Sequence, residues 1–239
     1  MDKICNELVE WLKNKVNEAN GKGLVFGLSG GIDSAVVAGL AKRAFPESSL
    51  GIIMPCHSNP KDEEHGLLVA DSLDLRTEKV DLSNVYDELI KSINIKDASK
   101  LALANIKPRL RMTTLYYFAQ TYNYLVIGSS NKSEFTVGYF TKHGDSGVDL
   151  LPIASFTKNE IWELARYLKI PEIIIEKPPT AGLWEDQTDE EEMGFGYDIL
   201  DNYIENKTGP EDIIHKIEDM NRISEHKRNF PPIFIPKNQ

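Results

Sequence analysis

The order of apolar and polar residues predicts helices and strands that alternate along the whole chain. Segments with apolar residues at helical spacing, or bounded by helix-end signals, predict helices at about 4–16, 33–44, 62–73, 97–122 and 158–168. Short apolar or alternating runs predict buried strands at about 24–28, 50–54, 77–82 and 124–128. This alternation indicates an α/β fold with a mostly parallel sheet flanked by helices. No linker divides residues 1–239, so we expect a single domain.

Three residues make sharper predictions about helix boundaries. Pro108 lies inside the stretch 97–122, where its missing N–H and bulky ring predict a kink or a break. Thr157 is expected to cap the helix at 158–168. Pro210 is expected in the first turn of a helix within the acidic C-terminal part of the chain.

The composition is that of an ordinary globular protein, with 41% hydrophobic and 27% charged residues. The two cysteines, Cys5 and Cys56, form no CxxC pair, which argues against a disulfide framework or a zinc ribbon and fits a reducing compartment. No apolar run approaches the roughly 18 residues that a membrane span needs, and the N-terminus lacks a signal-peptide apolar region. We therefore expect a cytoplasmic protein that does not engage a membrane.

The net charge of −10 is unevenly distributed. The segment Leu183–Glu225 holds 14 acidic and 3 basic residues, so the rest of the chain is close to neutral. No broad basic face for nucleic acid is indicated, and we expect no nucleic-acid partner. A local basic pocket for a small phosphorylated ligand remains compatible with this distribution.

The segment Ser29-Gly30-Gly31-Ile32-Asp33-Ser34 lies between a predicted buried strand and a predicted helix. Its glycines allow successive backbone amides to point into one concavity, and the helix start adds partial positive charge. The serine hydroxyls add further donors, so the segment predicts an anion site of pyrophosphate size. It matches neither the Walker motif, whose lysine is missing, nor GxGxxG. Ligands of parallel sheets bind at such strand ends, and a second polar strand end follows Gly128.

Asp33 adds information about the ligand. A carboxylate beside a phosphate site repels the phosphate, unless a magnesium ion lies between the two and takes oxygen ligands from both. The alternative is that Asp33 only caps the helix and the glycines only form a tight turn. The two serines and the aspartate together, directly after a strand, favour the anion site with magnesium.

The SGGIDS motif resembles the signature of the ATP pyrophosphatases, the PP-loop family, which split ATP into AMP and pyrophosphate. The chain further resembles the ammonia-dependent NAD synthetase family in separated blocks that follow one another in order. These blocks are Asn105–Met112, Gly128–Glu134, Gly138–Asp145 with Asp149–Pro152, Lys177–Ala181, and Glu225–Arg228. The resemblance implies an adenine nucleotide alpha hydrolase-like fold, which is Rossmann-like, over nearly the whole chain.

The resemblance also implies the reaction. Such enzymes adenylate the nicotinate carboxylate of deamido-NAD with ATP and release pyrophosphate, and ammonia then displaces AMP to give NAD, the final step of NAD biosynthesis. The first step is needed because a carboxylate is a poor electrophile, whereas its mixed anhydride with AMP has a good leaving group. The family implies magnesium and a homodimer with the dinucleotide site at the subunit interface. The larger members carry a glutaminase domain, which 239 residues do not accommodate, so free ammonia is the expected donor.

Site residues follow from the family's motifs, position by position. The implied ATP contacts are Gly27, Leu28, Ser29, Gly30, Gly31, Ile32, Asp33, Ser34, Ser129, Lys158 and Thr180. The implied magnesium ligands are Asp33 and Glu134. The implied deamido-NAD contacts are Arg109, Lys142, Asp149, His226 and Lys227. Asp145, in a glycine-flanked loop, is expected near the nicotinate or the incoming ammonia as a catalytic residue.

Three of these residues also have an interpretation that involves no ligand. Glu134 would be a solvated residue in the first turn of a helix, Lys158 a surface lysine and Arg109 an exposed helix charge. Two departures from the family are visible: Ser129 stands where threonine is usual, and Pro108 where a small residue is usual.

Two other functions compete with this one. The first is another PP-loop enzyme, such as a transfer-RNA thiolase or the synthetase part of GMP synthetase, although no second cysteine partners Cys56. The second is a nucleotide-binding module without catalysis, against which the two carboxylates Asp33 and Glu134 argue. For the dimer, the consecutive apolar residues Leu115–Phe118 are a possible interface, with burial inside the chain as the alternative.

Overall fold

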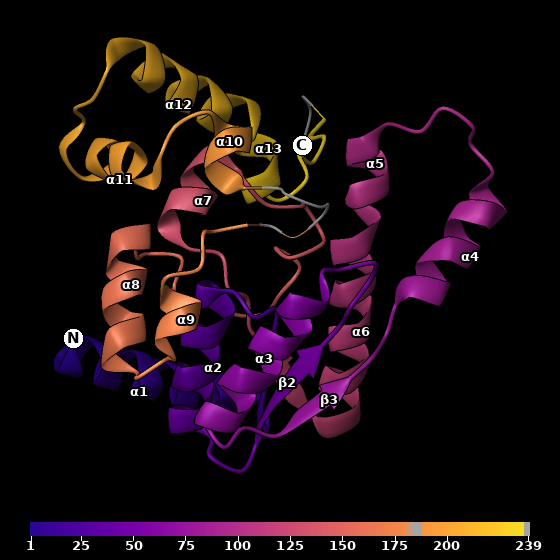
Figure 1. Ribbon diagram of the computed structural model, residues 1–239, viewed down its shortest axis with the longest axis vertical. Coiled ribbons are helices and arrows are strands. Elements are labelled where there is room, and N and C mark those ends of the chain that lie inside the picture. Colours follow the sequence, from indigo (N-terminus) through magenta and orange to yellow (C-terminus); the bar gives the residue numbers. More distant parts are fainter. Residues whose placement is uncertain (181, 183–187, 237–239) are drawn as a thin grey trace.

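The computed structural model describes residues 1–180, 182 and 188–236 (Figure 1). Four parallel strands form one sheet in the order β3-β2-β1-β4. Their bounds are β1 Gly23–Gly27, β2 Ser49–Ile53, β3 Thr77–Lys79 and β4 Tyr124–Val126. In the register, Val25 of β1 lies opposite Leu50 on one side and Val126 on the other. The expected mostly parallel α/β fold is confirmed.

Helices join and cover the strands. Those of the sheet region are α1 Asp2–Glu18, α2 Ile32–Ala44, α3 Pro60–Ser72, α4 Ser83–Ile93, α5 Lys100–Ala104, α6 Ile106–Tyr122, α8 Lys158–Tyr167 and α9 Glu172–Ile175. Those beyond the carboxyl ends of the strands are α7 Lys132–Val137, α10 Asp189–Met193, α11 Tyr197–Asn206, α12 Glu211–Ile223 and α13 Glu225–Arg228 (Figure 1). In the described part of the chain, no helix is both long and apolar enough to cross a membrane.

The central strands β1 and β2 are apolar on both faces because helices cover both, whereas the edge strand β3 is polar and largely exposed. Leu24 and Phe26 of β1 pack into the core shared with α1, α2 and α8, whereas Val25 packs with Leu115 of α6 on the opposite face. This alternation is the period of two that a strand imposes on its side chains. A third cluster, which includes Tyr197 and Leu200 of α11, builds a helical cap at the carboxyl ends of the strands.

Of the three helix-boundary predictions, the one for Thr157 is confirmed and those for Pro108 and Pro210 are wrong in position. Thr157 caps α8 in a complete capping box with Glu160. The stretch 97–122 breaks, but at Asn105 rather than at Pro108, which falls in the first turn of α6. A proline is tolerated there because the N–H that it lacks would have no partner within the helix. Pro210 stands one residue before α12 begins, and not in its first turn.

Candidate active site

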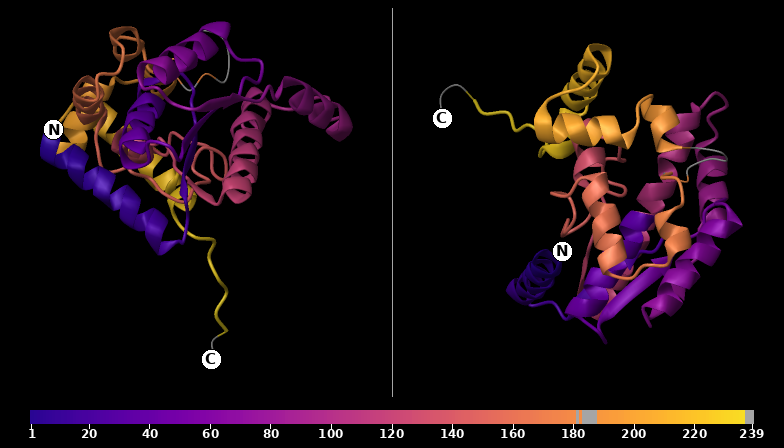
Figure 2. Two further views of the ribbon diagram at one scale, coloured as in Figure 1. Left: turned by 90° about the horizontal axis from the view of Figure 1, so that it is seen from below. Right: turned by 60° about the vertical axis from the view of Figure 1, so that its left-hand side comes forward.

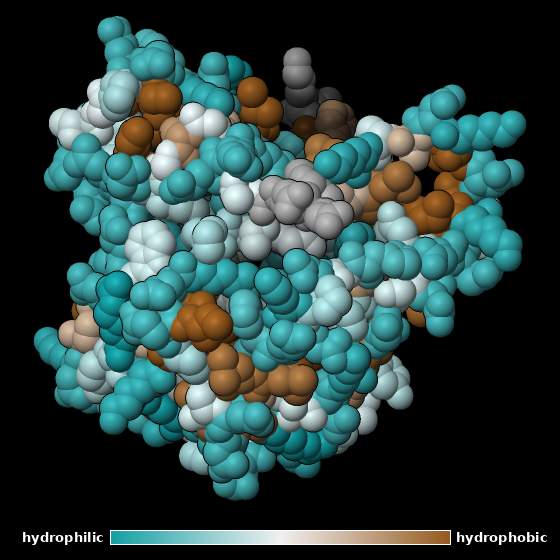
Figure 3. Space-filling model, in the orientation of Figure 1, coloured by the Kyte–Doolittle hydropathy of each residue, from teal (hydrophilic) through white to brown (hydrophobic). Residues whose placement is uncertain are grey.

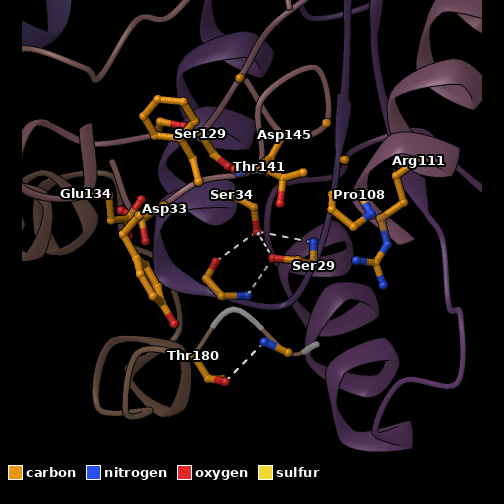
Figure 4. Close-up of a pocket in the computed structure, with 18 of the residues that line it drawn as sticks. Ser29, Asp33, Ser34, Pro108, Arg111, Ser129, Glu134, Thr141, Asp145 and Thr180 are labelled. Carbon is orange, nitrogen blue, oxygen red and sulfur yellow. Dashed lines mark hydrogen bonds between the residues drawn. The ribbon is translucent and has the colours of Figure 1, made fainter. Parts of the chain in front are cut away.

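A cavity of about 750 Å³ opens at the carboxyl ends of the strands, a volume typical of small-molecule sites. The β1–α2 turn, the end of β2, α6, the segments that flank α7, and α13 contribute to its wall (Figure 4). Most of the residues implied for the substrates line this one cavity. They are Gly27, Leu28, Ser29, Gly31, Ile32, Asp33, Ser34, Ser129, Glu134, Asp145, Lys158, Thr180, His226 and Lys227.

The two serines of the β1–α2 turn hold the turn in shape. Ser34 Oγ accepts a hydrogen bond from Ser29 N at 3.2 Å and donates one to Gly31 O at 2.9 Å. The hydroxyls of Ser29 and Ser34 lie 3.0 Å apart, and Gly31 N donates to Ser29 Oγ (Figure 4). The loop is therefore organised by its own side chains before any ligand arrives, which reduces the ordering cost of binding.

The backbone conformation at Gly30 requires a glycine at the second position of the turn. Its φ is +74°, in the left-handed region that L side chains rarely adopt. A Cβ at this position would lie 2.4 Å from the backbone oxygen of Asp62 and 2.8 Å from Cβ of His65. Gly30 therefore packs against α3 and does not line the cavity, although its neighbours in the turn do.

Lys158 lies at the centre of a charged cluster. Its Nζ is 2.6 Å from Asp33 Oδ2 and 3.3 Å from Glu134 Oε1, and its side chain is only 1% exposed. Asn131 Nδ2 also donates to Asp33 Oδ1 at 2.9 Å. The surface-lysine interpretation of Lys158 is therefore wrong, as is the solvated interpretation of Glu134, whose side chain is 15% exposed.

Burial and neighbouring charges shift the pKa values of this cluster. Burial raises the pKa of the Glu134 carboxyl, and the negative charge of Asp33 raises it further. Burial alone would lower the pKa of Lys158, but the carboxylates of Asp33 and Glu134 reverse this and hold it above its usual value. The cation on Lys158 is therefore firmly retained between the two carboxylates.

Asp189 and Tyr197 form a second layer that the sequence analysis did not identify. Tyr197 OH donates to Asp189 Oδ2 at 2.9 Å and lies 3.4 Å from Glu134 Oε1. Burial raises the pKa of Asp189. Asp189 belongs to the acidic segment Leu183–Glu225, and nothing local distinguishes it from the other acidic residues there.

This cluster fits a magnesium ion. The carboxyl groups of Asp33 and Glu134 contact the single ammonium group of Lys158, and Asp189 lies in the next layer, so acidic groups outnumber basic ones here. Among the described residues no group of three or more His, Cys, Asp or Glu is arranged to hold a metal ion by itself. Magnesium needs no such group, since it is commonly held by one or two carboxylates together with phosphates and water.

The loop with Asp145 and the helix α13 meet at another part of the cavity. Asp145 lines the cavity, and its Oδ1 accepts a hydrogen bond from Thr141 N at 2.8 Å (Figure 4). Desolvation by the surrounding protein raises the pKa of its carboxyl. Lys227 Nζ donates to the carbonyl oxygens of Gly138 at 2.8 Å and Phe140 at 3.0 Å. Lys227 therefore ties α13 to the segment that precedes Asp145.

Three residues implied for deamido-NAD do not line the cavity. Arg109 is exposed and donates to Lys142 O at 3.2 Å, and Lys142 Nζ donates to His226 O. Asp149 accepts from Val126 N at 2.8 Å and from Tyr116 OH at 3.0 Å. In the single chain, these side chains serve local hydrogen bonds.

Arg111 lines the cavity, although the sequence analysis selected Arg109 from the same block. Residues two apart on a helix point in different directions, so only one of the two can face the cavity. The sequence showed that this block holds two arginines, but it could not show which of the two faces the cavity.

The fold and the site together define a nucleotide-using α/β enzyme of the PP-loop class. Residues 4–231 match the family described as NAD synthase. The NH(3)-dependent NAD(+) synthetase of Carboxydothermus hydrogenoformans is 55% identical over 230 residues, which cover 95% of each chain. The chain belongs to the NAD synthase family, whose members are C–N ligases.

Solved structures agree with this assignment. The NMN synthetase of Francisella tularensis has a TM-score of 0.93 at 34% identity, covering 99% of this chain and 98% of that one. The NH3-dependent NAD synthetase of Campylobacter jejuni has a TM-score of 0.83 at 32% identity and covers 98% of both chains. The expected adenine nucleotide alpha hydrolase-like fold is thereby confirmed.

Proposed function

We propose that this chain converts deamido-NAD to NAD with ATP and ammonia, through an adenylated nicotinate, and releases AMP and pyrophosphate. The observation that carries the proposal is the cluster of Asp33, Lys158 and Glu134, which adjoins a preorganised anion turn at the strand ends. The 55% identity to an NH(3)-dependent NAD(+) synthetase supports the choice of acid and of nitrogen donor.

The chain's own residues have distinct tasks in this proposal. The backbone amides of the turn from Ser29 to Ser34 hold the pyrophosphate portion of ATP at the start of α2. Lys158 balances negative charge on the phosphates, and Ser129 and Thr180 add hydroxyl donors from the facing walls. Asp145, which lines the cavity, would orient the ammonia that attacks the activated carboxyl. The cavity walls limit access of water, which would hydrolyse the adenylate.

Magnesium is the proposed cofactor, with Asp33 and Glu134 as its protein ligands. Bound there, it would neutralise the negative charge of the departing pyrophosphate. Residues 1–239 are proposed to act as one domain that uses free ammonia, in the cytoplasm, where the two unpaired cysteines Cys5 and Cys56 stay reduced.

Product identification tests this function. The protein is incubated with ATP, magnesium and ¹⁵N-ammonium, with deamido-NAD as the acid in one reaction and xanthosine monophosphate in another. We expect pyrophosphate release and labelled NAD only in the first reaction. Release with xanthosine monophosphate alone would point to a different PP-loop enzyme, and no release with either acid would favour a binding module without catalysis.

A second candidate acid is nicotinate mononucleotide. The observation in its favour is the TM-score of 0.93 with an NMN synthetase. The chemistry at the carboxyl is the same, so only the specificity of the site for the rest of the acid would differ. A third reaction with this mononucleotide distinguishes the two acids. A larger kcat/KM than with deamido-NAD would make the mononucleotide the substrate and would leave the reaction class unchanged.

We also propose that the chain works as a homodimer in which Arg109, Lys142 and Asp149 reach the dinucleotide of the partner's site. Their position outside the cavity of the single chain supports this. Of the expected interface Leu115–Phe118, Leu115 is buried in its own core, whereas Tyr117 is 70% exposed. The exposed apolar side chains of α4 form a further surface that a second copy of the chain would cover.

The projecting helix α4 gives the dimer a direct test (Figures 2 and 3). Val85, Leu89 and Ile93 lie on one face of α4 and are exposed, and α4 buries none of its residues. We expect light scattering to give twice the chain mass of 27.0 kDa for the wild type, and the single mass for Leu89→Glu combined with Ile93→Glu. The polar-face variant Glu88→Gln is the control. A fully active wild-type monomer would contradict the proposal.

A further inference from the structure

Arg111 is a partly buried cation on the wall of the cavity. It lies on α6, where Nε donates to Met54 O at 3.1 Å and one terminal nitrogen donates to Ser58 Oγ at 3.1 Å. These bonds fix the guanidinium against the end of β2 and the loop that follows it. In Figure 4 Arg111 lies across the cavity from Asp33 and Glu134, with Ser29 between them.

The charge of Arg111 has no acidic partner at contact distance. No carboxylate of a described residue lies within 4.0 Å of its guanidinium, and the acidic groups that act on it electrostatically are, in decreasing order, Cys56, Asp145 and Asp62. Burial lowers the pKa of Arg111 accordingly. A cation held partly out of water without an acidic partner favours a bound anion. The guanidinium stays protonated and carries five N–H donors, of which the two bonds above use only part.

The lysines that line the cavity differ from Arg111 in this respect. Lys158 is paired with Asp33 and Glu134, and Lys177 Nζ lies 2.8 Å from Asp62 Oδ1 at the rim. Lys227 donates to two backbone carbonyls. Arg111 is thus held rigidly by neutral acceptors while its charge remains available to a ligand.

We propose that Arg111 binds an oxyanion of the reacting substrates, a phosphate of ATP or the carboxylate or a phosphate of the acid. This inference rests on the proposed function for the identity of the substrates. The planar fork of arginine matches the two oxygens of a carboxylate or phosphate, and the bonds to Met54 and Ser58 orient it in advance. Arg111 then faces the anion turn from the opposite wall and helps to bring the two negatively charged substrates together.

Binding measurements with Arg111→Ala and Arg111→Lys test the proposal. Calorimetry with ATP alone and with deamido-NAD alone separates the two sources of the oxyanion. We expect Arg111→Ala to weaken one of them by about 10- to 100-fold, the range for a lost bond to a charged group. Arg111→Lys keeps the charge but loses the fork, so it should weaken the same ligand by less. If the affinity for deamido-NAD falls, the same measurement with NAD, which lacks the carboxylate charge, shows whether Arg111 binds that carboxylate.

Chemical rescue separates binding from a structural role. Added guanidinium can enter the space left in Arg111→Ala, so we expect it to restore a several-fold part of the lost affinity. Arg43→Ala is the matched control, because Arg43 contacts Cys5 Sγ away from the cavity. A general effect of guanidinium would change both variants alike.

Defined outcomes overturn the proposal. It fails if Arg111→Ala is folded and binds both ligands within twofold of the wild type, or if its affinity is lost without rescue while its melting temperature falls. If Arg111→Ala does not fold, Arg111→Lys decides, and unchanged affinity for both ligands overturns the proposal. Absence of amidation by the wild type would instead reject the proposed function, because the ATP binding comparison does not require turnover.

Discussion

Replacing Lys158 with methionine is expected to lower the melting temperature by about 6–20 °C. Methionine keeps most of the side-chain volume but removes the cation between Asp33 and Glu134. Breaking a buried pair in this way costs about 3–5 kcal/mol, and each kcal/mol corresponds to roughly 2–4 °C in a chain of this size. Thermal unfolding monitored by circular dichroism measures the shift.

The effect of Lys158→Met should depend on pH and on magnesium. Without the cation, the pKa of the Glu134 carboxyl, already raised by burial, rises further. A folded-state pKa above the unfolded value favours the folded state at low pH, and that benefit disappears as pH rises through the folded pKa. The variant should therefore lose more stability at pH 8 than at pH 6, and magnesium should restore more stability to it than to the wild type.

The control for this experiment is Lys13→Met, which removes an exposed ion pair with Glu10 and should change the melting temperature very little. Equal melting temperatures for Lys158→Met and Lys13→Met would show that the buried cluster does not stabilise the fold as described.

Asp33→Asn is expected to reduce turnover by at least about 100-fold while the fold is retained. The amide oxygen can still accept from Asn131, and Lys158 keeps its contact with Glu134, so the loss of stability should be moderate. The loss of activity should be larger because changes in the outer shell of a metal site alone reduce affinity or activity by about 10- to 100-fold, and a direct ligand contributes more.

Two measurements check the Asp33→Asn prediction. The rate of NAD formation as a function of magnesium concentration gives the activity, and binding of Mn²⁺ in the presence of ATP gives the metal affinity without turnover. The exposed Asp71→Asn is the control for removing one negative charge. Near-normal activity of Asp33→Asn at limiting magnesium would contradict the assignment of Asp33 as a metal ligand.

The core elements were predictable because their signals are local. The apolar run before Ser29 is long enough for a strand buried on both faces, and Thr157 with Glu160 is a complete capping signal. Helix α4 was not predicted, although Val85, Leu89 and Ile93 stand at helical spacing, because its surroundings are polar and it packs little against its own chain. The break before α6 was displaced from Pro108 because proline fits a first helical turn.

The amino-acid sequence by itself determined the sheet strands, the SGGIDS turn and the family blocks. These features are local, because the spacing of apolar residues specifies a strand, and glycines and serines specify a turn that presents backbone N–H donors. Only the tertiary structure decided that Lys158 is buried between Asp33 and Glu134, and that Arg111 rather than Arg109 faces the cavity. Residues more than a hundred positions apart form that cluster, as Asp33 and Lys158 do. Their burial and charge balance arise from how the helices pack on the sheet, which no local pattern encodes.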